Sequence, residues 1–146
     1  MSGIHPSPII ACAVKSSRVT ADGGEFVQFI AVVLTGLVAV IHVGFLVLEM
    51  VLWRTPTGMR IFATDAAFAE RSATLAANQG LYNGFLAAGL AWSLVAAEPT
   101  AYQVRLFFLG CVIVAGVFGA ATVSRRILVL QALPAAVALV FVVVSH

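Results

Sequence analysis

The stretch FVQFIAVVLTGLVAVIHVGFLVLEMVLW, residues 26–53, decides the fold of this 146-residue chain. It carries one carboxylate, Glu49, and one histidine, His42, among side chains that are otherwise almost all apolar. A helix needs roughly 20 predominantly apolar residues to cross the hydrocarbon core of a bilayer. Residues 26–53 therefore predict a membrane-spanning helix.

The composition of the whole chain agrees with this prediction. Hydrophobic residues make up 62% of the sequence and charged residues 10%, whereas a soluble domain has about 25% charged residues. Eight basic and six acidic residues are too few to cover the surface of a soluble fold of this length. High hydropathy excludes a disordered chain, and a net charge of +2 gives no reason to expect a nucleic-acid partner.

Three more apolar segments follow, at residues 75–97, 106–123 and 127–144. They are too long for the alternating segments of about ten residues that build a membrane β-barrel. We therefore predict an all-α integral membrane protein, with four transmembrane helices in an up-down-up-down bundle. Residues 25–146 form this membrane domain, and residues 1–24 are expected to be a flexible extension.

Polar connections separate the segments. The sequence Thr55-Pro56-Thr57-Gly58 predicts a turn, Thr64 or Asp65 is expected to cap the second helix, and Ser124-Arg125-Arg126 predicts a tight hinge. The first and third connections share one side and hold five basic residues: Arg54, Arg60, Arg71, Arg125 and Arg126. Lys15, Arg18 and Arg105 lie on the other side. The positive-inside rule then places the arginine-rich side in the cytoplasm, with both termini outside.

Ionisable side chains within a membrane span are costly, so they are candidate functional residues. His42 and Glu49 are seven residues apart and share a helical face. Because consecutive spans are antiparallel, Glu49 is expected to lie level with the polar start of the second span. We predict a pocket with His42 and Glu49 as catalytic residues, in the half of the bilayer that faces the arginine-rich loops. Its expected substrate-binding residues are Trp53, Asn78, Gln79, Tyr82, Asn83, Phe85 and Gln131.

Each of these residues also has a purely structural interpretation. Glu49 can extend to the interface and pair with Arg54 or Arg126, and His42 can be a buried, hydrogen-bonded core residue. The amides can join helices, while Tyr82 and Trp92 can anchor the interface.

Small residues recur every four positions in the third segment. Cys111, Ala115 and Gly119 form one stripe, and Val112, Gly116 and Ala120 form another. Such stripes allow close helix packing. They indicate either packing inside the bundle or a homo-oligomer interface through Ala115, Gly116 and Gly119. The two cysteines, Cys12 and Cys111, form no disulfide framework, and no spacing typical of a metal site occurs.

From residue 29 to 144 the chain resembles a bacterial family of small four-span membrane proteins, domain-of-unknown-function family 1304. The resemblance rests on Gly36-Leu37-Val38-Ala39, His42, Glu49-Met50, Trp53 and, above all, Asn78-Gln79-Gly80-Leu81-Tyr82-Asn83-Gly84-Phe85. It implies an inner-membrane protein of four helices, and it implies no activity.

The pocket residues favour a membrane-embedded enzyme that uses acid–base chemistry on an isoprenoid or other lipid-like molecule, as an isomerase or a terpene-type cyclase. Glu49 would donate the proton, with His42 as its partner or as the base. The amides would orient these groups, and Trp53, Tyr82 and Phe85 would line the cavity. The chain lacks the Asp-rich magnesium motif of soluble cyclases, so we expect metal-independent chemistry without a cofactor.

Two other classes of function stay open. Small multidrug exporters also have four helices and an essential glutamate in the first, so a proton-coupled exporter of small cations is one alternative. A non-enzymatic packing or assembly protein, in which the polar cluster only fixes helix register, is the other.

Overall fold

The structure is a computed structural model that describes the backbone of residues 8–146 and the side chains of residues 23–146. The predicted all-helical fold is confirmed, because this described range contains helices and no strand. Its elements are α1 (Pro8–Met50), α2 (Pro56–Phe62), α3 (Ala66–Val95), α4 (Thr100–Thr122), the π-helical segment η1 (Leu128–Ala132) and α5 (Leu133–Val144). Residues 1–7 lie outside the described residues, so the flexible extension predicted for residues 1–24 stays a prediction there.

The connection after the first apolar segment folds differently from the predicted turn. α1 ends at Met50, and a short additional helix, α2, begins at Pro56. The Thr55 side chain caps α2 by accepting a hydrogen bond from the Gly58 backbone N–H at 3.2 Å. Proline suits the first turn of a helix, where its missing N–H needs no partner. Pro56 therefore starts α2, whereas α1 has already ended at Met50.

The start of α3 agrees with the sequence. Asp65 is the N-cap, and its carboxylate accepts a hydrogen bond of 2.7 Å from the Phe68 backbone N–H. α4, in contrast, begins at Thr100, ahead of the apolar segment predicted from residue 106. The Glu98 carboxylate accepts a hydrogen bond from the Tyr102 backbone N–H at 3.0 Å, which satisfies one of the free donors of the first turn. Arg105 thus lies inside a helix, not at its edge.

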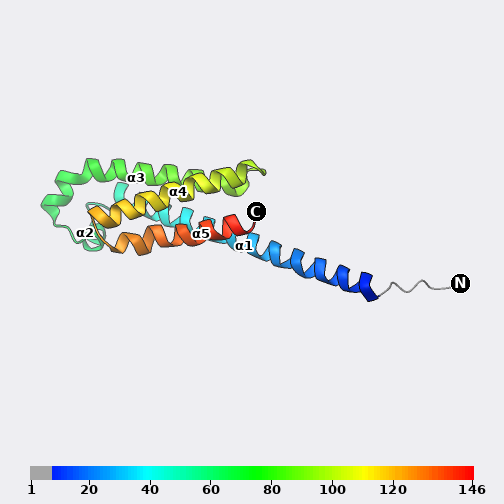
Figure 1. Ribbon diagram of the computed structural model, residues 1–146. Helices are drawn as coiled ribbons and strands as arrows, with labels where there is room; N and C mark the ends of the chain where they lie inside the picture. The colour runs from blue at the N-terminus through cyan, green and yellow to red at the C-terminus, as the bar shows by residue number, and fades with distance from the viewer. Residues whose placement is uncertain (1–7) are drawn as a thin grey trace.

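The long helices α1, α3, α4 and η1–α5 lie side by side (Figure 1). α1 and α3 run antiparallel, because a Cβ added to Gly36 would lie 3.7 Å from Leu94, whereas one added to Gly80 would lie 2.6 Å from Met50. α4 and η1 approach closely at Gly116, whose added Cβ would lie 2.8 Å from the Ala132 backbone nitrogen. α1 extends well beyond the other helices at its N-terminal end (Figure 1).

A narrow core of small and branched side chains runs along the centre of the helices. Its fully buried members come from every long helix: Ala31, Val38, Leu90, Leu109, Val112, Ala135, Ala138 and Val142. Alanine is frequent here because it lets helices pack at short distances.

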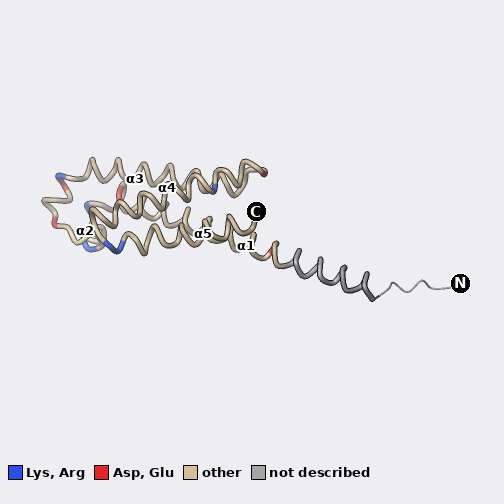
Figure 2. Tube along the Cα trace, viewed as in Figure 1, with Lys and Arg blue, Asp and Glu red and all other residues tan. Residues whose placement is uncertain are grey.

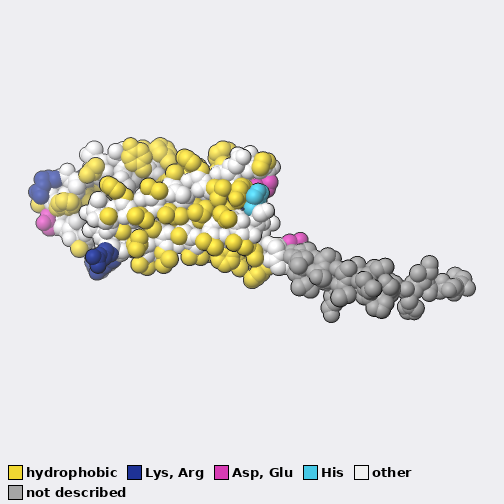
Figure 3. All heavy atoms as spheres, viewed as in Figure 1, with side chains coloured by type: hydrophobic (Ala, Val, Ile, Leu, Met, Phe, Trp, Pro, Cys, Tyr) yellow, Lys and Arg dark blue, Asp and Glu magenta, His cyan; other side chains and the backbone are white. Residues whose placement is uncertain are grey.

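The outer surface is apolar over most of its length (Figure 3). Large hydrophobic side chains such as Val40, Leu75, Val114 and Phe118 are all more than 65% exposed, at 67%, 72%, 71% and 69%. Charged residues gather at the end of the molecule that holds α2 and the α4–η1 connection (Figure 2). Within the described range, two helices are long and apolar enough to cross a membrane: Gly23–Met50 and Thr100–Thr122. Only 28% of the most apolar window in each is buried, whereas the core helix of a soluble protein is mostly buried.

Candidate functional site

The candidate site is centred on a hydrogen bond between α1 and α3. The Asn83 side-chain amide donates to a Glu49 carboxylate oxygen at 2.7 Å, and it also lies 3.3 Å from the Gln79 backbone carbonyl. Asn83 is 6% exposed, so this contact is inside the helix pair. The expectation that Glu49 lies level with the polar start of the second apolar segment therefore holds to within about one helical turn, because its partner is Asn83 and not Asn78 or Gln79.

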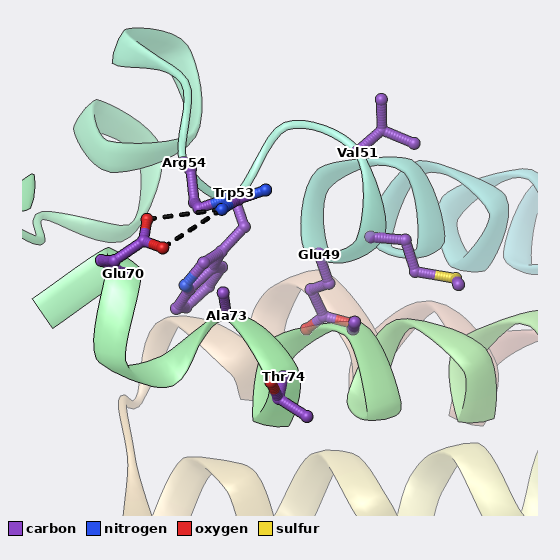
Figure 4. A pocket seen from close by; sticks show the side chains of 9 residues that line it. Glu49, Val51, Trp53, Arg54, Glu70, Ala73 and Thr74 are labelled. Atoms are coloured by element: carbon purple, nitrogen blue, oxygen red, sulfur yellow. Dashed lines mark hydrogen bonds and ion pairs between the residues drawn. The ribbon is translucent and has the colours of Figure 1, made fainter.

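A glycine brings the two helices together at this point. A Cβ on Gly80 would lie 3.1 Å from the Glu49 Cβ and 3.2 Å from the Leu46 backbone carbonyl oxygen. The missing side chain lets the Glu49 backbone approach α3, so that the carboxylate meets Asn83 directly. Figure 4 shows the Glu49 side chain pointing from α1 toward α3.

Beside this contact lies a partly open cavity of about 430 Å³, between the end of α1, the residues that follow it and the first turns of α3 (Figure 4). Its lining residues are Glu49, Met50, Val51, Trp53, Arg54, Glu70, Ala73, Thr74 and Ala77. The four residues from α3 are spaced by three and four positions, so they share one helical face. Three of the lining residues were not predicted: Arg54, Glu70 and Thr74. For Glu70 and Thr74, the spacing after the predicted cap is visible in the sequence.

Trp53 forms one wall of the cavity and is firmly held. Its indole N–H donates to the Ala69 carbonyl and to the Ser72 hydroxyl, both at 3.1 Å. The indole ring also packs on Phe62, with ring centroids 4.7 Å apart. Because its polar group is already bonded to α3, Trp53 can offer only aromatic surface to a ligand.

The arginines do not pair with Glu49. Arg54 instead pairs with Glu70 at 3.3 Å, and both side chains are mostly exposed, at 64% and 69%. The two ion pairs between described side chains are this one and Arg105–Glu98. The alternative in which Glu49 pairs with Arg54 is thus not the arrangement in the structure, and Glu49 keeps a neutral amide as its hydrogen-bond partner.

His42 lies apart from Glu49, although both are on α1. It is fully buried, and its Nδ1 makes a hydrogen bond of 2.8 Å with the Val38 backbone carbonyl. The Nε2 atom is buried and has no hydrogen-bond partner among the described residues. Its ring packs edge-to-face on Phe45. Among the described side chains, no hydrogen bond joins His42 to Glu49. The two residues therefore have no direct path for proton transfer between them.

The other predicted site residues have different positions. Tyr82 and Phe85 are 54% and 57% exposed on the outer side of α3. Asn78 and Gln79 are exposed as well, and Gln131 in η1 is half-buried without a hydrogen bond between described side chains. None of these five residues lines the cavity at Glu49. Of the predicted substrate-binding residues, Trp53 and Asn83 are the two that the structure places at Glu49.

Arg105 is a second buried ionisable residue, at the opposite end of the helices. Its guanidinium donates to the Ser93 carbonyl at 3.1 Å and pairs with Glu98 at 3.3 Å, and the residue is 8% exposed. α4 begins at Thr100, ahead of the apolar segment predicted from residue 106, so the helix carries Arg105 within it.

The small residues of α4 divide between the interior and the surface. Gly116 packs on Ala132, and a Cβ on Gly119 would lie 3.1 Å from Ile127 of the same chain. Ala115 faces outward and lines a shallow apolar groove with Cys111 and four other residues of α4: Phe107, Gly110, Val114 and Phe118. The homo-oligomer predicted through Ala115, Gly116 and Gly119 stays a prediction.

Comparison with known proteins gives one finding. A search of the curated proteins and a search of the solved structures produced no match. The family model described as "Protein of unknown function (DUF1304)" matches residues 36–143, a range that includes His42, Glu49, Trp53 and Asn83. The chain therefore belongs to the DUF1304 family of proteins of unknown function.

Proposed function

We propose that this protein is a four-span enzyme of the bacterial inner membrane that moves a proton to and from a lipid-like molecule at Glu49. The apolar exterior and the two long apolar helices support a membrane location. α4 has 23 residues, which corresponds to about 34 Å at the helical rise and is enough to cross the hydrocarbon core. In this proposal α3 and η1–α5 cross beside α1 and α4, and the arginine-rich end faces the cytoplasm.

One observation carries the proposed chemistry. The Glu49 carboxyl lies at a cavity and has a neutral amide, Asn83, as its hydrogen-bond partner at 2.7 Å. A carboxyl that is paired with a cation is held in its ionised form. Glu49 has no such cation among the described side chains, so it can both give up and regain a proton, as a general acid and base must.

The proposed step is an isomerisation or cyclisation of an isoprenoid or similar molecule. The Glu49 carboxyl gives its proton to one carbon of a C=C bond, which forms a C–H bond and leaves a carbocation on the other carbon. The carbocation shifts or closes a ring, and a neighbouring carbon then loses a proton to the Glu49 carboxylate. Asn83 orients the carboxyl, while the aromatic face of Trp53 stabilises the positive charge. No redox change occurs, and the proton count is the same before and after.

The test follows solvent deuterium into lipid. Membranes that contain the protein are incubated in D₂O with an extract of bacterial neutral lipids, which are then analysed by mass spectrometry. We expect at least one isoprenoid species to gain carbon-bound deuterium when the wild-type protein is present. The Glu49→Gln variant keeps the shape of the side chain and an oxygen that accepts from Asn83, so it should fold and yet leave the lipid unlabelled.

Glu25→Gln is the matched control, because it removes an exposed carboxylate of the same helix that does not line the cavity. Labelling by Glu25→Gln at a rate close to wild type supports Glu49 as the specific acid. Labelling that persists in Glu49→Gln overturns the proposal. A Glu49→Gln protein that does not fold would favour the packing role, and pH-driven movement of a cation through reconstituted vesicles without any labelling would favour the exporter.

A further inference from the structure

We propose that the molecule bound in the cavity is an amphiphile whose end at Glu49 becomes cationic during the reaction, and that the cavity therefore binds a cationic amphiphile more tightly than a neutral one. This inference rests on the proposed function and names the chemical class of its ligand. Three independent properties of the cavity lead to it.

The first property is charge. The cavity is lined by two carboxylates, Glu49 and Glu70, and one guanidinium, Arg54. Arg54 and Glu70 neutralise each other in an ion pair at 3.3 Å. When Glu49 is ionised, the lining therefore has one uncompensated negative charge, located at a half-buried residue. A negative charge of this kind attracts a cation most strongly where water is partly excluded.

The second property is the aromatic wall. The indole N–H of Trp53 is used by Ala69 and Ser72, so the ring contributes no hydrogen-bond donor that would select an anion. Its aromatic face is the surface that attracts a cation, and tryptophan is the best of the aromatic side chains for this contact. Glu49 and Trp53 line the same cavity, so one cationic group can meet both.

The third property is the opening of the cavity. Met50 and Val51 line it and are 46% and 67% exposed on the apolar outer surface. A ligand can therefore keep its hydrocarbon chain on that surface while its polar end enters between α1 and α3. This geometry fits an amphiphile that reaches the cavity from within the membrane better than it fits a fully water-soluble ion.

The experiment uses Trp53 as the reporter. The chain has two tryptophans, so the Trp92→Phe variant leaves Trp53 as the single emitter. The purified variant, in a neutral maltoside detergent, is titrated with decyltrimethylammonium and separately with decanol, which has the same chain and no charge. We expect the cation to change Trp53 emission at about one tenth of the concentration that decanol requires, a ratio that corresponds to about 1.4 kcal/mol.

Two further variants on the Trp92→Phe background show where the preference arises. Glu49→Gln should abolish the difference between the two probes. Glu25→Gln, which removes an exposed carboxylate on the N-terminal part of α1, should keep the full difference. A preference that survives in Glu49→Gln, or that disappears in Glu25→Gln, would overturn the inference, since the charge would then act from the surface or from the micelle.

The outcome can be separated from that of the deuterium test. If decanol binds as tightly as the cation and lipid labelling still depends on Glu49, the charge inference fails and the proposed enzyme stands. If the cation is preferred through Glu49 but no lipid is labelled, the inference stands and the proposed enzyme fails. If neither probe alters Trp53 emission, the cavity does not bind amphiphiles and the inference fails.

Discussion

Each end of the bundle holds an ionisable side chain, buried at Arg105 and half-buried at Glu49, and the two side chains have different partners. At one end, Arg105 has a carboxylate, Glu98, and a backbone carbonyl as partners. At the other end, Glu49 has a hydrogen bond from the neutral amide of Asn83 and borders a cavity. The charge of Arg105 is thus balanced by an opposite charge and by a carbonyl oxygen. The Glu49 carboxyl is stabilised only by the dipole of one amide.

The difference separates a structural role from a chemical one. A buried charge with a matched partner costs free energy when that partner is removed, so Arg105 contributes to holding α3 and α4 together. A carboxyl without a counter-ion is free to change its protonation state or to meet a cationic ligand. Burial of a charge alone does not distinguish these roles, and the partners do.

The largest expected effect is at Arg105. Arg105→Met removes both hydrogen bonds and leaves Glu98 and the Ser93 carbonyl without their partner, so the free energy of unfolding should fall by about 2–3 kcal/mol. Denaturant unfolding in detergent, followed by far-ultraviolet circular dichroism, measures this change. Lipid labelling by the folded fraction should be retained. An Arg105→Met protein as stable as wild type would show that the guanidinium is not a structural contact.

The next effect is at Asn83. Asn83→Ala removes the hydrogen bond to Glu49 from a buried position and should lower the free energy of unfolding by about 1–2 kcal/mol. It should also reduce the proposed lipid labelling, because the Glu49 carboxyl loses its orientation. Asn78→Ala, on the exposed side of the same helix, is the control and should change neither quantity. Equal effects in both variants would contradict a specific Glu49–Asn83 contact.

A smaller effect is expected at the wall of the cavity. Trp53→Phe keeps an aromatic face but removes the N–H that donates to Ala69 and Ser72. The loss of this hydrogen-bonding group should cost about 1 kcal/mol and weaken the preference for a cationic probe without abolishing it. Thermal unfolding together with competition against a fluorescent alkylammonium gives both values. Complete loss of probe binding in Trp53→Phe would mean that the N–H, not the ring, holds the ligand.

The smallest effect is expected for the exposed ion pair beside the cavity. Arg54→Ala removes a contact between two side chains that are 64% and 69% exposed, and such pairs contribute about 0.2–1 kcal/mol. It also leaves Glu70 unpaired and thereby adds one negative charge to the cavity lining. Unfolding should therefore change little while the cationic probe binds more tightly. Weaker binding of that probe would show that Arg54 itself contacts the ligand.

Much of the helical fold was predictable because composition and hydropathy indicate where the long helices lie. The apolar segments, the Asp65 cap and the polar hinge at residues 124–126 all have local sequence signals. The structure agrees with them except in the last segment, where residues 128–132 are π-helical and precede α5. The short helix α2 and the early start of α4 were not predicted. Both depend on caps, at Thr55 and Glu98, that continue a helix through polar sequence where hydropathy predicts an end.

The site was predictable only where a contact depends on how far along its helix each residue lies. Helix rise alone places Glu49 level with the polar start of the second apolar segment, and its partner Asn83 lies about one turn farther along α3. Rotation about the helix axis is set by packing, and that is why Asn78 and Gln79 face outward while Asn83 faces α1. The ion pair of Arg54 with Glu70 depends on how α2 folds the chain back, which no local pattern reveals.

The unbroken helix α3 has a mechanical consequence. It carries the partner of Glu49, at Asn83, and a partner of Arg105, at Ser93. These two contacts are ten residues, or about 15 Å, apart on one rigid rod. A ligand that rotates α3 and moves Asn83 away from Glu49 must also shift the Ser93 carbonyl relative to Arg105. A spectroscopic label beside Arg105 would therefore report ligand binding at the distant cavity.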